Sequence, residues 1–463
     1  MERMSGSDAA LLHMEDASTP MHTLKVVILD VARRGRPISF DELALAVGSR
    51  LGLVPRSTQK VVTVPGFGAR PFWVDDPEFD LRLHLDERIL AAPGDARQLD
   101  ALYAELAARQ LPRDRALWAM TLVHGLEHGR QAVVVRVHHA IADGLAAMHT
   151  FLAASTAEPG TTVAIAPAST PPVPSQVRLA RAAVRDLRHS LSSLPSLLRR
   201  SRAAGVARRP YKRNPEIPSL AVFGRTSLNA DGGGARTCAS GSLDLTTMRA
   251  ISKASGTTVN GVLHGVIAGA LRAELAARGE DVSEPTVAAF GIATDTADQD
   301  RRHGNHVTPT FVRLRSDLDD PMARLEATAR SCRVAVEARR AAGLDLTDQL
   351  TAHAPRALNA FRRLAGRYTS MNPSHVVTAN CAGPHARRWL GEIEVVDWFS
   401  FAVSVAPAVV NITVHSYDGR MNVGILGNPA ALRDPHALLQ RMACELDVLA
   451  RAIGAPSTLT QLN

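Results

Sequence analysis

The amino-acid sequence predicts an α/β protein built from two layered domains. Its 463 residues are too many for one ordinary hydrophobic core and suit two domains of about 200 residues each. Segments with the pattern of strands and of helices are interspersed in both halves, which is typical of layered α/β folds. Between the halves, the proline-rich stretch 159–176 cannot continue regular structure and indicates a linker. The predicted division is therefore 1–158, 159–215 and 216–463.

The first domain is expected to be a mixed layer of strands and helices. An apolar run predicts a strand at Leu24–Val31, and the pair Leu117–Val123 and Gln131–His138 has the pattern of a hairpin. The other expected elements are helices at Phe40–Leu51 and Gln98–Gln110 and strands around Lys60–Val64, Phe72–Val74 and Leu81–Leu85.

The second arm of that hairpin runs directly into the motif His138, His139, Asp143 and Gly144. Successive side chains of a strand point to opposite faces, so one histidine is expected to pack and the other to face a reaction space. A neutral imidazole near its working pKa can take a proton from an attacking alcohol or thiol. Asp143 is close enough to orient a ring or hold a cation, and Gly144 would permit a tight turn before the helical stretch Leu145–Ala157. The motif indicates a rigidly mounted base.

Two other interpretations of the motif compete with this one. A histidine at a strand end is often a satisfied structural residue, and a His-His-x-x-x-Asp pattern could also ligate a metal. Because the two rings face opposite sides, they are poorly placed for one metal, and we expect none. The glycine run Gly232–Gly234 does not follow a strand and only weakly suggests a phosphate site. The chain has no Gly-x-Ser-x-Gly nucleophile elbow.

The segment Val177–Arg213 is rich in arginine and has a helical pattern, which Pro195 should kink or restart. Its apolar and basic side chains recur on two faces: Val184, Leu187, Leu191, Leu194 and Leu198 on one, and Arg181, Arg185 and Arg188 toward the other. The commoner arrangement for such a helix is a crossover packed on the protein with a solvated basic face. The alternative is an interfacial helix that rests on anionic lipid or a lipid droplet.

The second domain repeats the mixed pattern of strands and helices. Pro321 occupies a first-turn position that a helix tolerates, and Asp418-Gly419 favours a tight turn between strands. Helices are expected at Thr246–Ala254, Val259–Arg278, Pro321–Ala342, Leu350–Arg367 and Pro435–Ile453, and strands at Thr286–Ile292, His375–Asn380, Phe399–Val405, Val409–Ser416 and Arg420–Ile425.

Composition narrows the class of protein further. Hydrophobic residues make up 46% and charged residues 21%, as in globular proteins. The formal net charge of +8 comes almost wholly from arginine, but aromatics at 4% leave little for stacking bases, so we expect no nucleic-acid partner. The four cysteines show neither metal spacing nor a disulfide pattern. With no apolar signal core and no run of about 18 apolar residues, a cytoplasmic location is expected.

The histidine motif resembles the His-His-x-x-x-Asp-Gly signature of the chloramphenicol acetyltransferase-like acyltransferases, which include peptide-synthetase condensation domains and plant acyltransferases. Within that superfamily the chain resembles the bacterial wax ester synthase/diacylglycerol acyltransferases nearly end to end. The family's usual Asn-Asp pair appears here as Asn260-Gly261. The matching segments, in the family's order, are Met4–Asp8, Pro20–His22, Arg113–Trp118 with alanine for the usual proline, Gly304-Asn305, Asp320-Pro321, Arg324-Leu325, Asn380–Pro384, Asn411–Thr413 and Ser416-Tyr417.

The resemblance implies two chloramphenicol acetyltransferase-like mixed-sheet domains, joined by a helical crossover, with the active channel between them. It implies that acyl donor and acceptor meet at His139, the second histidine of the motif, which acts as general base. His138, Asp143 and Gly144 complete the motif, and Asp143 is expected to hold its geometry through an ion pair or a turn hydrogen bond.

The same resemblance implies O-acyl transfer from a long-chain acyl-CoA, a co-substrate, without any cofactor. The acceptor would be diacylglycerol, giving triacylglycerol, or a long-chain alcohol, giving a wax ester. Asn260, Asn305 and Asn411 are expected to contact substrate or to join the domains, and peripheral contact with the inner membrane or with lipid droplets is expected. A carrier-dependent condensation-type acyltransferase and a noncatalytic lipid-binding protein that keeps the fold are the alternatives.

Overall fold

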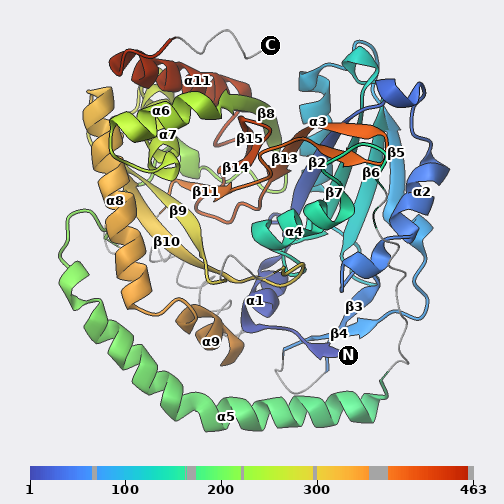
Figure 1. Ribbon diagram of the computed structural model, residues 1–463. Coiled ribbons are helices and arrows are strands. Elements are labelled where there is room, and N and C mark those ends of the chain that lie inside the picture. The colour runs from blue at the N-terminus through green and yellow to red at the C-terminus, as the bar shows by residue number, and fades with distance from the viewer. Residues whose placement is uncertain are drawn as a thin grey trace.

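The computed structural model describes residues 1–64, 70–161, 163, 174–219, 224–295, 300–353 and 374–456. Two six-stranded mixed sheets lie side by side, each with helices against it (Figure 1). The first sheet has the strand order β12-β13-β2-β7-β6-β5 and the second β10-β9-β11-β14-β15-β8. A small third sheet, β1-β4-β3, lies near the N-terminus. The predicted α/β class with two mixed-sheet domains is confirmed.

The first sheet is built around β7 (Gln131–His138), which has antiparallel neighbours on both sides. Its valines alternate between two cores: Val134 packs with residues of α3 (Ala96–Ala108), whereas Val133 packs with Met148 of α4 (Gly144–Ala154). Both faces of β7 are therefore covered, which makes its end a rigid mount for the histidines. The other strands that the N-terminal half gives to this sheet are β2 (His22–Asp30), β5 (Leu85–Ile89) and β6 (Trp118–His124).

Two strands of the first sheet come from the C-terminal half of the chain. β13 (Ile393–Phe401) pairs antiparallel with β2, and β12 (Arg388–Leu390) pairs with β13 at the edge. The predicted boundaries at residues 158 and 215 therefore do not separate the two sheets. The correction has a physical cause. The edge of β2 is covered by a strand from the far end of the sequence, with Leu24 paired to Phe401, and no local pattern can predict such a pairing.

The second sheet and its helices enclose the largest hydrophobic core among the described residues. Helix α7 (Val259–Ala277) is buried on nearly every side, and Gly265 lets α8 (Pro321–Ala341) approach, because an added Cβ would lie 2.6 Å from Cδ1 of Leu325. The remaining elements are β8 (Thr237–Asp244), β9 (Thr286–Ala293), β10 (Val307–Leu314), β11 (Val376–Cys381), β14 (Asn411–Tyr417), β15 (Arg420–Gly427), α6 (Leu245–Ala254) and α11 (Pro435–Ala452).

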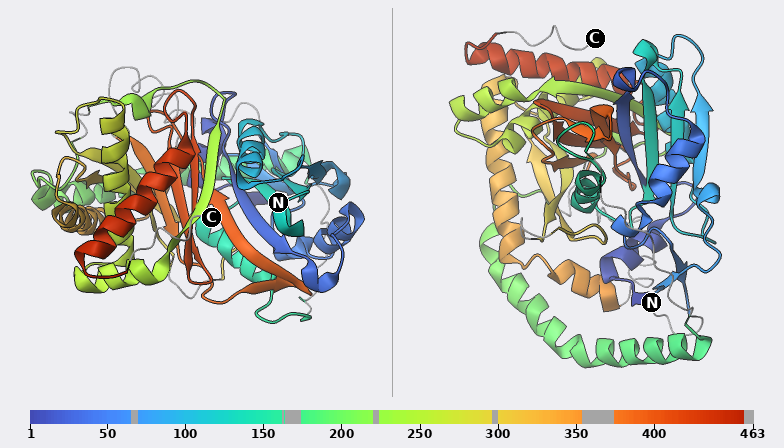
Figure 2. Two further views of the ribbon diagram at one scale, coloured as in Figure 1. Left: turned by 90° about the horizontal axis from the view of Figure 1, so that it is seen from above. Right: turned by 45° about the vertical axis from the view of Figure 1, so that its right-hand side comes forward.

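Helix α5 (Gln176–Ala207) connects the halves along the outside of the molecule (Figures 1 and 2). It continues through Pro195, so the predicted restart at this residue is wrong. Pro195 is exposed, and the helix curves along its length instead of ending, as exposed helices that contain a proline can do. Its C-terminal part packs against α9 (Leu346–His353).

The other small elements lie near the N-terminus and at the edge of the first sheet. They are β1 (Glu2–Arg3), α1 (Gly6–Met14), α2 (Phe40–Gly48), β3 (Gln59–Val62) and β4 (Phe72–Asp75). In the part of the chain that the structure describes, no helix combines the length and apolar character needed to cross a bilayer.

Several predicted elements differ from the structure. The strand expected at Leu81–Leu85 is a 3-10 helix, Leu81–His84, followed by β5, because Asp80 caps the backbone N–H of Arg82. Strands β8 and β10 were not predicted. The predicted helix Leu350–Arg367 begins earlier, in α9, and residues 354–373 lie outside the described residues, as do 162 and 164–173 of the predicted linker.

Candidate active site

The two histidines of the motif occupy different environments. His138 is completely buried, its Nδ1 accepts the backbone N–H of Ala140 at 3.0 Å, and its Nε2 lies 3.7 Å from a carboxylate oxygen of Glu15. His139 follows the end of β7 and is half-buried, with its backbone N–H donating to the carbonyl of Met21 at 2.7 Å. This placement agrees with the alternation of a strand: His138 packs, and the ring of His139 is the more accessible one.

The ring of His139 is held by an amide from the other half of the chain. Its Nδ1 lies 2.7 Å from Oδ1 of Asn305, and Nδ2 of Asn305 donates to the His139 carbonyl at 2.5 Å and to Oδ1 of Asp8 at 2.8 Å. Asp8, in α1, is 1% exposed, and burial raises the pKa of its carboxyl. The second carboxylate oxygen of Asp8 is 3.5 Å from Arg56. Asn305 and Asp8 thus form a fixed support behind His139.

This arrangement indicates which nitrogen of His139 carries the proton. An amide Oδ1 can only accept, and both N–H groups of the Asn305 amide are already donated, so Nδ1 of His139 must be the donor. The proton on Nδ1 leaves Nε2 with a free lone pair. Such a tautomer is the one that a general base requires.

Asp143 is engaged away from the His139 ring. One carboxylate oxygen caps α4 by accepting the N–H of Ala146 at 2.9 Å. The other accepts from Arg301 at 2.7 Å and from the backbone N–H of His306 at 2.9 Å. The guanidinium of Arg301 also donates to the Gly304 carbonyl at 2.7 Å. Through Arg301 and the His306 N–H, Asp143 therefore holds the segment that carries Asn305 in place.

Backbone contacts tie the same two segments together. Residues Ala142 and Gly304 form a parallel bridge, in which Gly304 N–H donates to the Ile141 carbonyl at 2.5 Å and Asp143 N–H donates to the Gly304 carbonyl at 3.2 Å. Gly304 has a φ of +78°, a conformation that favours glycine. The motif and the 304–306 segment are thus one unit that spans both halves of the chain.

Gly144 has a different role from the predicted one. It does not adopt a positive φ; it is the first residue of α4. An added Cβ would lie 2.9 Å from Sγ of Cys381, at the end of β11. Glycine is required here because the second sheet approaches α4 closely, and not because the chain turns.

Of the three asparagines predicted to bind substrate, the structure brings only Asn305 to His139. Asn260 lies in the first turn of α7, where its Oδ1 accepts from Asn380 at 3.2 Å. Asn411 is 1% exposed and bonds to the Val403 carbonyl at 2.7 Å and to the Thr413 hydroxyl at 2.7 Å. The amide of Asn411 is thus occupied within the protein.

Gly261, which follows Asn260, is required for the close packing of α7 against α8. A Cβ at Gly261 would lie 2.5 Å from Oγ1 of Thr257 and 3.1 Å from Cβ of Ala329 in α8. A larger side chain at Gly261 would therefore push α7 away from α8.

Lys25 is a site residue that sequence reasoning missed. It is paired with Val135 across β2 and β7, on the strand face that also carries His139, and it is 8% exposed. Its ammonium donates to the Ser400 hydroxyl at 2.6 Å, and burial lowers the pKa of Lys25 to about 8. The signal available in the sequence was a single lysine within the otherwise apolar run Leu24–Leu29. Asp8 lies in the segment Met4–Asp8 that resembles the family's opening, but its contact with Asn305 and the ion pair of Arg301 with Asp143 join residues distant in sequence and gave no local signal.

Electrostatics keep the His139 ring neutral. Burial is the largest influence and lowers the pKa of His139, and the charge of Lys25 lowers it further, while Asp143 and the Asn305 bond raise it. Burial also places the pKa of His138 well below its ordinary value. The Cys381 thiol, whose pKa burial raises to about 11, remains protonated at neutral pH. Among the described residues, no three His, Cys, Asp or Glu side chains are grouped as metal ligands.

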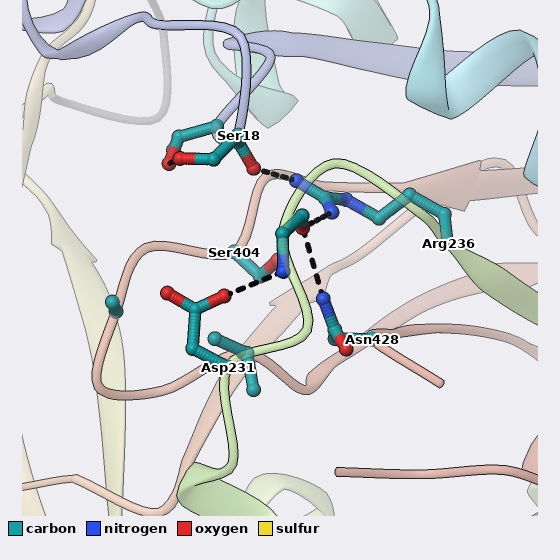
Figure 3. A pocket seen from close by; sticks show the side chains of 9 residues that line it. Ser18, Asp231, Arg236, Ser404 and Asn428 are labelled. Carbon is teal, nitrogen blue, oxygen red and sulfur yellow. Dashed lines mark hydrogen bonds between the residues drawn. The ribbon is translucent and has the colours of Figure 1, made fainter. Parts of the chain in front are cut away.

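A small pocket opens elsewhere between the two halves, between the loop before β2 and the loops of the second sheet (Figure 3). Arg236 donates from there to the carbonyls of Ser18 at 2.8 Å and Gly233 at 2.9 Å, and Asn428 also donates to Gly233, at 2.9 Å. Asp231 accepts the Gly233 N–H at 3.0 Å. These groups bond to one another and join the halves, and none belongs to the histidine motif.

Two solved structures share this fold. A wax ester synthase/diacylglycerol acyltransferase from Marinobacter aquaeolei VT8 superposes with a TM-score of 0.70 at 21% identity, covering 98% of this chain and 100% of that one. The first condensation domain of the CDA synthetase superposes with a TM-score of 0.56 at 14% identity, covering 100% and 98%. At these identities the likeness shows the fold alone, the two-domain fold of chloramphenicol acetyltransferase-like proteins.

Sequence comparison gives the family. The model described as wax ester synthase/diacylglycerol acyltransferase catalytic domain matches residues 4–263, and that of the WS/DGAT C-terminal domain matches residues 303–450. A putative diacylglycerol O-acyltransferase of Mycobacterium tuberculosis is 30% identical over 464 residues, covering 99% of this chain and 98% of the relative. A second one from that organism is 29% identical over 470 residues, covering 99% of each. The chain belongs to the wax ester synthase/diacylglycerol acyltransferase family and is an acyltransferase of that type.

Proposed function

We propose that the protein transfers a long-chain acyl group from acyl-CoA to the hydroxyl of diacylglycerol or of a long-chain alcohol, with His139 as the general base. The observation that supports this most directly is the hydrogen bond between Nδ1 of His139 and Oδ1 of Asn305, at 2.7 Å. It orients the ring and leaves Nε2 free to accept a proton.

The proposed reaction is a direct transfer that needs no covalent enzyme intermediate. Nε2 of His139 takes the hydroxyl proton as the acceptor oxygen attacks the thioester carbonyl carbon, and a tetrahedral oxyanion forms. When this intermediate collapses, the carbon–sulfur bond breaks and the imidazolium returns the proton to the departing thiolate. Ester and free coenzyme A are the products, and His139 is neutral again.

The low pKa of His139 suits the first half of this cycle. A ring that is neutral at pH 7 is ready to accept a proton, and the imidazolium that forms in the buried site is a correspondingly strong acid toward the thiolate. Asp143 does not touch the ring, so its part in the proposal is to hold Arg301 and the segment of Asn305 in place.

Acyl-CoA enters the proposal as a co-substrate, and no cofactor is required. The acceptors proposed are membrane-soluble, so the protein would work in peripheral contact with a membrane or lipid-droplet surface. His138, Gly144, Asn260 and Asn411 have packing or interdomain contacts in the structure, and their part in catalysis or substrate binding stays a prediction.

The test is an acceptor panel with purified protein. Palmitoyl-CoA is offered with dioleoylglycerol, with hexadecanol or with neither, and the products are identified by mass spectrometry. Formation of triacylglycerol or of wax ester would support the proposal and decide between the two acceptors. Binding of both lipids without turnover would favour the noncatalytic alternative, and turnover with a carrier-bound thioester but not with palmitoyl-CoA would favour a condensation-type enzyme.

A further inference from the structure

Helix α5 exposes a stripe of leucines. Leu187, Leu191, Leu194 and Leu198 are 43%, 63%, 42% and 52% exposed. They are spaced by four, three and four residues, which places them on one face of the helix. Single exposed leucines are common on protein surfaces, but four on one helical face form a continuous apolar patch of the kind found at contact surfaces. The expectation that these leucines pack on the protein is therefore wrong.

Another face of α5 already holds the helix on the protein. Asp186 accepts from Arg3 and from Arg70, both at 2.6 Å, near the start of the helix. Farther along, Arg200 donates to Asp345 at 2.8 Å. Buried residues of α5 also pack beside Ala342 and Leu346, namely Leu197 and Ala204. The leucine stripe lies on a different face from these anchors and is exposed, on a helix that runs along the outside of the molecule (Figure 1).

The stripe is bordered by positive charge. α5 contains seven arginines and one acidic residue, the ion-paired Asp186. Arg188 directly follows Leu187, and Arg199 and Arg202 lie one and four residues after Leu198; all three arginines are exposed. An apolar stripe beside a row of cations is typical of helices that lie in the interface of a phospholipid bilayer. Arginine side chains at that depth meet lipid phosphates.

We propose that α5 is the surface by which this protein docks on an anionic phospholipid bilayer. The leucine stripe enters the acyl-chain boundary, and Arg188, Arg199 and Arg202 contact the head groups. This inference deepens the proposed function, because it names the surface through which an enzyme with lipid-soluble acceptors would reach them. It does not depend on the chemistry at His139.

The first experiment measures co-sedimentation of the full chain with vesicles. The vesicles are phosphatidylcholine with about a third phosphatidylglycerol, compared with pure phosphatidylcholine. The variant Leu187→Gln/Leu191→Gln/Leu198→Gln keeps good helix formers at exposed positions, so its unfolding midpoint should not change. We expect its partition onto anionic vesicles to fall at least tenfold. The matched control, Leu45→Gln/Leu83→Gln, alters two exposed leucines elsewhere and should bind as wild type.

The second experiment removes the charges that border the stripe. The variant Arg188→Gln/Arg199→Gln/Arg202→Gln should lose about fivefold in binding to anionic vesicles for each arginine, and most of its salt dependence. Binding to pure phosphatidylcholine should change little. The control carries the same loss of charge on the opposite end of the molecule, at exposed positions of α6 and of the segment before α11: Arg249→Gln, Lys253→Gln and Arg433→Gln.

Three outcomes would overturn the inference. The first is vesicle binding of the leucine variant equal to that of wild type, and the second is a loss of vesicle binding in the control variants as large as in the α5 variants. The third is a wild type that is dimeric and a leucine variant that is monomeric in sedimentation velocity, with vesicle binding retained. That result would make the stripe a contact between copies of the chain. A His139→Ala protein should bind vesicles as wild type does, so failure of the docking surface is distinguishable from failure of the proposed chemistry.

Discussion

Replacement of Asn305 by alanine tests how the base is held. The substitution removes the acceptor of the His139 Nδ1–H and the donor to Asp8, both in a site that is largely closed to water. An unsatisfied buried polar group costs about 1–3 kcal/mol. Without Asn305 the His139 ring loses its fixed orientation and tautomer. If this weakens transition-state stabilisation by about 2–3 kcal/mol, kcat should drop about 30- to 150-fold.

The same substitution should also shift the pH profile. The Asn305 bond raises the pKa of His139, so its loss should move the acidic limb of the kcat/KM profile to lower pH. Steady-state kinetics with palmitoyl-CoA and the acceptor found by the panel, from pH 4.5 to 8, measures both effects. Asn428→Ala, which removes another buried amide that bonds to the Gly233 carbonyl outside the histidine motif, is the control. If Asn305→Ala keeps the kcat and the pH profile of wild type, the support has no part in catalysis.

Three further predictions concern the surroundings of the base. Asp143→Asn removes one of the two carboxylates that pair with Arg301, the other being Asp295, and should lower stability by about 1.5–3 kcal/mol together with activity, as thermal unfolding and kinetics would show. A stable protein with a large catalytic loss would point to direct chemistry instead. Lys25→Met removes a buried ammonium whose pKa is lowered to about 8. Because burial penalises only the charged lysine, the free energy of unfolding of the variant should exceed that of wild type by about 3 kcal/mol below pH 8. This advantage should disappear as the pH rises toward 10.5. An unchanged unfolding midpoint at pH 7 would refute this. Gly144→Ala should cost about 1–3 kcal/mol by crowding Cys381, and Cys381→Ala should restore part of it in chemical denaturation.

Local sequence patterns were enough to predict the strand that positions the proposed catalytic base. The alternation in Gln131–His138 predicted a strand with the two histidines on opposite sides, and the structure buries His138 and leaves His139 half-buried. The apolar segment before it predicted a hairpin partner, which is β6. These features depend on residues that are close in sequence, where side-chain period and burial are directly linked.

The support behind His139 could not be predicted in the same way. Asn305 lies 166 residues after His139, and Asp8 lies 297 residues before Asn305. Nothing in the local sequence reports that these three side chains meet. The same limit applies to β13, whose pairing with β2 depends on the return of the chain to the first sheet.

The amphipathic pattern of α5 was visible in the sequence, but its orientation was not. Helical spacing shows which leucines share a face. The ion pairs of Asp186 and Arg200, with the buried Leu197 and Ala204, show which face is turned toward the protein. The pattern alone favoured packed leucines, and the structure exposes them.

The most direct test of the central claim is the rate of ester formation by His139→Ala, measured beside His138→Asn, which keeps an acceptor for the Ala140 N–H. With thermal unfolding showing both variants folded, the account predicts a loss of more than about a hundredfold for His139→Ala, since Nε2 is the proposed proton acceptor, and a clearly smaller loss for His138→Asn. Equal activity of wild type and a folded His139→Ala protein would contradict the account.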